Sequence, residues 1–290
     1  MILDNLFTSI ADLRNYVPDL EANKTFASLN ASAVSAYKQI CIIISKDVYK
    51  TISEIEDTAD PDEMKEALKT AIANLTISKQ LVFDTINRRK NNIEVYKYEL
   101  EEMKRNYQAS YYDAMDTLIS LLNESTIEAW KNSTYYKLID SLKIKSAQDF
   151  DAIYPIDQSY LFFFRCIPLQ KEVLDEKMEG IFSRAISNES ANALLNRALA
   201  KYIIATALRR FDILEFPEVI RGLFKDSKVT RSGDLEQTRI LKLAESLEDE
   251  ADNLIKDVDI MLTEETETNV VTQTSYNQPD DKIFLIPLHR

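Results

Sequence analysis

The chain has 290 residues, a formal net charge of −13 at pH 7, three glycines and seven prolines. So few turn-forming residues favour long helices over sheets, and the acidic balance argues against specific nucleic-acid binding because phosphate contacts need a basic face. No apolar run reaches the ~18 residues of a membrane span, and the N-terminus lacks the basic start of a signal peptide. We expect a soluble protein made inside a cell, with no membrane partner.

A short helix is the first predicted element, in SIADLRNYVP at residues 9–18. Serine followed three positions later by aspartate is a helix-start pattern, because each side chain can support an unpaired N–H of the first turn. The proline ends the helix. The same pattern returns in SAQDFDAIYP at residues 146–155, 137 positions later (9 to 146). The repeat predicts that each half of the chain begins with one such helix.

Three longer helices are predicted to follow in the first half. Residues 31–55 are apolar enough to form a buried helix. Asp60-Pro61 opens a second helix that runs to about Arg89. Its stripe, with gaps of three and four residues, comprises Leu68, Ile72, Leu75, Lys79 at the edge, Val82 and Ile86. A third helix, within a helical stretch over 93–138, has the stripe Leu100, Met103, Tyr107, Tyr111, Ala114, Leu118 and Leu121.

The second half repeats this order of parts. Residues 158–182 form another apolar segment, in which Pro168 is expected to kink a helix, and 187–214 resembles the second helix of the first half. The last long helix repeats the spacing of the third through Ile240, Leu243, Leu247, Ala251, Leu254, Val258 and Met261. We therefore predict an all-α fold: a helical bundle of two tandem-duplicated units, 1–145 and 146–262, with long antiparallel helices packed into one body.

The second unit contains an insertion at residues 215–234, which is expected to project as a loop or small hairpin. Its basic residues, candidates for protein contacts, are Arg221, Lys225, Lys228 and Arg231. Residues 245–267, in contrast, carry ten acidic residues and one lysine. This asymmetry is interpreted either as ordinary surface charge or as acidic and basic surfaces that meet between neighbouring copies.

The final segment, 263–290, is rich in threonine, asparagine and glutamine and has no helical stripe. It ends in an apolar run whose large side chains are Ile283, Phe284, Leu285, Ile286 and Leu288. These side chains are unfavourable in water, and Pro287 permits an edge strand but not a central one. We expect an extended C-terminal arm that binds an adjacent ring protein, most favourably the portal. The alternative is that the arm packs on the helical bundle of its own chain.

Most known catalytic sites need residue types that this chain does not supply. The only histidine is His289, which removes Ser-His-Asp, Cys-His and histidine-containing metal sites, and three glycines cannot build a known phosphate loop. Acids at 249–259 and 279–281 leave a magnesium-dependent all-α enzyme open as an alternative, although the first group is better interpreted as a solvated helix face. Cys41 and Cys166 are interpreted as buried free thiols. We expect that the protein is not an enzyme and that it has no catalytic, metal-binding or cofactor-binding residue.

Several stretches together resemble a known group of proteins. They are LRNYVP, AYKQICIIISKDVY, SAQDFDAIYPIDQSYLFFFRCIPL, FPEVIRG and DDKIFLI. In their order and apolar pattern they resemble an uncharacterised helical family of tailed phages and prophages of gut bacteria, including crassvirus-like phages. The likeness extends from about residue 9 to the end, but the helical stretch 93–138 departs from it, so no residue role is carried over.

The resemblance implies a structural virion protein, assembled in the bacterial host cytoplasm and located in the tail and connector region. Such a head-to-tail connector or adaptor forms a ring of twelve copies beneath the portal, so the implied partners are other copies, the portal and further connector or tail ring proteins. A cytoplasmic helical scaffold or chaperone-like interaction protein is the alternative function in the non-enzyme class.

Overall fold

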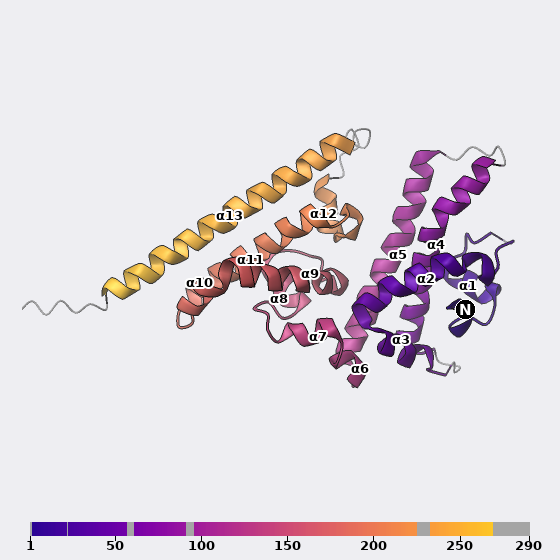
Figure 1. The fold of residues 1–290 in the computed structure, drawn as a ribbon, viewed down its shortest axis with the longest axis horizontal. Helices are drawn as coiled ribbons and strands as arrows, with labels where there is room; N and C mark the ends of the chain where they lie inside the picture. The colour runs from indigo at the N-terminus through magenta and orange to yellow at the C-terminus, as the bar shows by residue number, and fades with distance from the viewer. Residues whose placement is uncertain (1, 22, 57–60, 91–95, 225–232, 269–290) are drawn as a thin grey trace, which may run out of the picture.

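The computed structural model describes residues 2–21, 23–56, 61–90, 96–224 and 233–268 (Figure 1). Every regular element in these ranges is helical, which confirms the predicted all-α class. A single cluster of buried apolar side chains extends from Leu3 in the first half to Val258 in the second. The two halves are therefore joined through one continuous core.

The first half is dominated by two long antiparallel helices, α4 and α5, crossed by α2 (Figure 1). The Ser9 hydroxyl accepts from the backbone N–H of Asp12 at 3.1 Å, so the predicted cap starts α1. The helical elements of this half are η1 (Leu3–Asn5), α1 (Ile10–Tyr16), α2 (Phe26–Ile44), α3 (Lys46–Ser53), α4 (Glu63–Lys90) and α5 (Lys97–Glu124).

The helix expected over residues 31–55 is divided in two at Ser45, which corrects the prediction of one continuous element. Ser45 has φ of 73°, a value that does not belong to a helix. Its N–H donates to the carbonyl of Cys41 and closes α2, while its hydroxyl accepts from the N–H of Val48 and starts α3. One residue thus caps both helices. Apolar composition alone could not show this break, because both segments contribute buried side chains.

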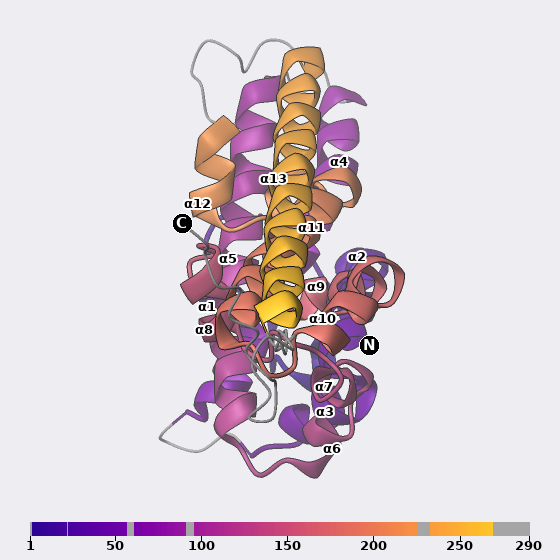
Figure 2. The same cartoon turned by 90° about the vertical axis from the view of Figure 1, so that its left-hand side faces the viewer.

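The second half has the same pairing of helices. Ser146 accepts from the N–H of Asp149 at 3.0 Å and starts α8, as its counterpart does in α1. The long helices α11 and α13 lie side by side (Figures 1 and 2), and α9 packs on α11. The elements are α6 (Glu128–Lys131), α7 (Thr134–Ile139), α8 (Ala147–Ile153), α9 (Tyr160–Val173), the π-helical turn η2 (Leu174–Met178), α10 (Glu179–Arg184), α11 (Glu189–Arg210), η3 (Ile213–Glu215), α12 (Glu218–Arg221), η4 (Gly222–Phe224) and α13 (Gly233–Thr268).

The two halves share an order of packing as well as an order of helices. In the first half α1 and α2 both pack on α4, which pairs with α5; in the second half α8 and α9 both pack on α11, which pairs with α13. This correspondence is what a duplicated unit would give, although the duplication itself stays a prediction. Helix α13 continues to Thr268, past the predicted unit boundary at residue 262.

The described part of the insertion at 215–234 differs from the expected projecting loop or hairpin. Phe216 and Ile220 are buried and belong to the main core, and the Phe216 ring lies 5.3 Å from that of Phe162 in α9. These contacts hold η3, α12 and the start of η4 against the body. Residues 225–232 lie outside the described part of the chain.

The two halves meet where α5 contacts the start of α9. The Asp116 carboxylate on α5 accepts from the Leu161 N–H at 2.7 Å and from the Ser159 hydroxyl at 3.1 Å. A residue of the first half therefore supports the first turn of a helix in the second, where unpaired N–H groups attract negative charge. Burial nevertheless raises the pKa of Asp116 to about 6, with the hydrogen bonds opposing the shift.

We expect Asp116→Asn to become more stable relative to the wild type as pH rises. The folded-state pKa lies above the unfolded value of about 3.9, so the stability that Asp116 contributes is complete below about pH 4 and is lost as pH rises through about 6. Asparagine keeps an acceptor oxygen but cannot ionise, and the relative gain should reach about 1–3 kcal/mol at pH 7. Urea unfolding across pH 4–7 measures it, with Asp249→Asn at an exposed position of α13 as control. Parallel curves for Asp116→Asn and wild type would refute the assignment.

Candidate functional site

A cavity with a volume of about 400 Å³ lies between the end of α5, α7, the start of α8 and α9. Aromatic side chains of Tyr136, Tyr160 and Phe164 form part of its wall. Two of its amides already have partners: Asn123 accepts from the Trp130 indole N–H at 3.0 Å, and Gln148 donates to the Tyr160 hydroxyl. The cavity has room for a ligand, but these amides are used for holding helices together.

Metal-ligating side chains do not converge within the described residues. Among them, no group of three or more His, Cys, Asp or Glu side chains is arranged to hold a metal ion. Both cysteines are free. Cys166 is buried as predicted, while Cys41 is only partly buried, and burial raises the pKa of Cys41 to about 11 and that of Cys166 further. Neither thiol ionises readily near neutral pH, so neither is suited to act as a nucleophile. The absence of enzymatic activity stays a prediction.

The acidic stretch of α13 is largely exposed, as expected for a solvated face, and three of its acids pair with bases of the same chain. Glu248 pairs with Arg209 of α11 at 2.7 Å, and Glu250 pairs with Lys201 of the same helix. Asp259 pairs with Arg184 of α10 at 2.7 Å. The hydrogen bond from Lys201 lowers the pKa of Glu250. These contacts orient α13 along α11, so part of the charge asymmetry read from the sequence has an intramolecular use.

Most of the predicted contact residues fall outside the described chain. Arg221 is described: it lies in α12 and pairs with Glu218 of the same short helix at 3.1 Å, while its Nε is buried without a hydrogen-bond partner. The pairing is local to α12, and Arg221 exposes only 16% of its side chain, so little of it is free for a contact with another protein. The other candidates lie outside the described residues, namely Lys225, Lys228, Arg231, Ile283, Phe284, Leu285, Ile286 and Leu288.

An exposed apolar surface lies at the free end of the α4–α5 hairpin. Part of it was predicted from the sequence to be buried. We call it the hairpin tip and define it by five side chains, each of which exposes between 47% and 67% of its surface. They are Val82, Phe83, Ile86, Tyr96 and Tyr98. The rings of Tyr96 and Tyr98 stack on each other at 5.7 Å. In Figure 1 this end of the hairpin extends past α1 and α2, which cover the base of α4.

The hairpin tip corrects the predicted stripe of α4. Leu68, Ile72 and Leu75 are buried as expected, but the stripe continues through Val82 and Ile86 into the exposed end. The periodic spacing correctly marked an apolar face, whereas burial needs a covering element. Large exposed apolar side chains gathered in one place are the usual mark of an interaction surface.

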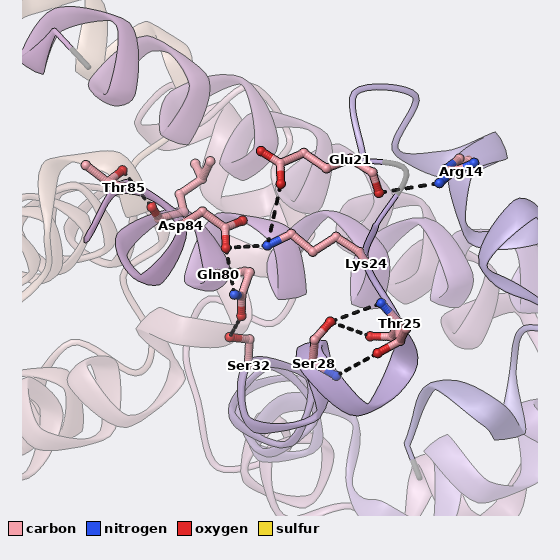
Figure 3. A network of polar contacts seen from close by, with 10 residues as sticks. Arg14, Glu21, Lys24, Thr25, Ser28, Ser32, Gln80, Asp84 and Thr85 are labelled. Carbon is pink, nitrogen blue, oxygen red and sulfur yellow. Dashed lines mark hydrogen bonds and ion pairs between the residues drawn. The ribbon is translucent and has the colours of Figure 1, made fainter. Parts of the chain in front are cut away.

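A polar network just below the hairpin tip fixes which side of α4 faces outward (Figure 3). Asp84 pairs with Lys24, and Gln80 donates to the Asp84 carboxylate at 2.9 Å. The Ser32 hydroxyl of α2 donates to the Gln80 carbonyl oxygen at 2.8 Å. Because these polar groups tie one side of α4 to α2 and to the segment before it, the apolar side chains on the other side stay at the surface.

Comparison with known proteins gives no match: no family model fits the chain, and neither a curated protein nor a solved structure is significantly similar to it. None of the described helices has the length and apolar character needed to cross a bilayer. Among the described surfaces, the hairpin tip has the geometry that best fits an interaction site.

Proposed function

We propose that the protein is a structural virion subunit, a head-to-tail connector or adaptor that forms a ring under the portal and links it to the tail. The single observation that supports this proposal most is the hairpin tip, where Phe83, Tyr96 and Tyr98 are held in water on a long, well-anchored hairpin. Phenylalanine and tyrosine are enriched at the buried centres of protein interfaces. An assembly subunit would cover this surface in its finished state.

Two alternatives have different consequences. A cytoplasmic helical scaffold or chaperone-like protein would use the same surface but would be missing from finished particles. A magnesium-dependent all-α enzyme would need carboxylates that converge on a cavity, and the acids of α13 that have partners here, such as Glu248 and Asp259, are turned toward arginines. That arrangement supports the interaction classes over the enzyme.

We expect the chain to be present in purified virions of the phage that encodes it, at a ring stoichiometry near twelve copies per particle. Quantitative mass spectrometry of the particles, referenced to the portal, measures both. Absence from the particles would favour the scaffold, and would refute the connector proposal. Micromolar binding of Mg²⁺ in calorimetry would favour the enzyme instead.

A further inference from the structure

We propose that the hairpin tip of one copy binds the C-terminal segment, residues 269–290, of a neighbouring copy. The inference rests on the proposed function, because it supplies the contact by which copies would join into a ring. It differs from a docking of that segment on the portal, since both surfaces now belong to the same chain. Each copy would donate its segment to the next and receive one from the previous copy, a head-to-tail arrangement that closes into a ring.

The first argument is chemical complementarity of the apolar groups. On α4, Val82, Phe83 and Ile86 are spaced at i, i+1 and i+4, so they lie on one side of the helix. All three are about half exposed. The C-terminal segment carries the run IFLIPL at 283–288, whose five large apolar residues come within six positions. Both groups of side chains are unfavourable in water, so each gains from covering the other.

The second argument is reach. Helix α13 begins near the end of the molecule that carries the hairpin tip and runs away from it to the far end (Figures 1 and 2). It has 36 residues, and is therefore about 54 Å long at 1.5 Å per residue. The apolar run starts 15 residues after Thr268 (283 − 268), which spans at most about 54 Å at full extension. The run cannot retrace α13 and pass beyond it to its own tip, but a neighbouring copy can place a tip within reach.

The test uses three full-length variants beside the wild type. The tip variant is Phe83→Asp with Ile86→Asp, and the segment variant is Phe284→Asp with Ile286→Asp. The control is Ile42→Asp with Ile186→Asp, because these two apolar residues are 61% and 76% exposed but lie on other elements. Sedimentation velocity measures self-association, and thermal melting checks that each variant is folded.

We expect the wild type and the control to assemble, and the tip and segment variants each to self-associate at least tenfold more weakly with unchanged melting temperature. An equimolar mixture of the tip and segment variants should form a 1:1 dimer and nothing larger, because only one tip–segment contact remains for each pair. This restored pairing is the decisive result.

Three outcomes would overturn the inference: a monomeric wild type, a segment variant that assembles normally, or a mixture that stays monomeric. The last would place the segment on its own bundle or on another protein. The connector proposal would still stand if such a chain were found in virions. Conversely, if the mixture forms dimers but the chain is absent from virions, the tip–segment contact is supported and the connector proposal is refuted.

Discussion

Replacing Trp130 with alanine is expected to lower the free energy of unfolding by about 3–5 kcal/mol. Trp130, in the short helix α6, is fully buried and stacks on Phe164 of α9 with ring centroids 5.1 Å apart. Its edge contacts Tyr136 of α7 at 5.7 Å, and its indole N–H donates to Asn123 at the end of α5. One side chain thus joins four helices around the junction of the two halves, and its removal leaves a large cavity there.

Urea unfolding followed by circular dichroism measures this loss, because Trp130 is the only tryptophan and its fluorescence disappears with the substitution. Tyr98→Ala is the matched control, since it also removes an aromatic ring but from an exposed position on the hairpin tip. A surface change of that kind is expected to stay within about 0.5 kcal/mol. Equal losses for the two variants would mean that the junction is not packed as described.

A second large loss, of about 2–6 kcal/mol, is expected for Gln170→Leu. The Gln170 side chain on α9 is buried, and its amide accepts from the Ile144 N–H at 2.9 Å and donates to the Ile144 carbonyl at 3.0 Å. It thereby satisfies both backbone groups of a buried residue that lies in no helix. Leucine has a similar size but leaves both groups unpaired, at about 1–3 kcal/mol each. Chemical denaturation at neutral pH gives the value.

Gln170→Glu separates the hydrogen bonds from the packing. A protonated carboxyl can accept and donate as the amide does, whereas the buried carboxylate cannot donate and repels the Ile144 carbonyl. The introduced acid therefore has a folded-state pKa raised above about 4.3, and the stability linked to its proton is complete below that value and lost as pH rises through the raised pKa. The variant should approach the wild type near pH 4 and fall below it at pH 7. Equal stability at pH 7 would rule out this role for Gln170.

Local signals in the sequence determined the fold class and where several helices begin. Few glycines and prolines, together with stripes at gaps of three and four, specify long helices whatever surrounds them. The serines at positions 9 and 146 start α1 and α8 as predicted, because a cap needs only the first turn that follows it. These properties depend on residues close together in the chain, so they can be read without a structure.

Tertiary structure decided what covers each helix. The break at Ser45 follows from hydrogen bonds on both of its sides. Three acids of α13 pair with bases on α10 and α11, and Phe216 in the expected loop lies in the core. The stripe of α4 is the clearest case, because the same spacing is buried at Leu75 and exposed at Ile86. Periodicity specifies that a helix has an apolar face, whereas burial of that face depends on which other elements reach it. At the hairpin tip none of the described elements does, and that surface became the candidate site.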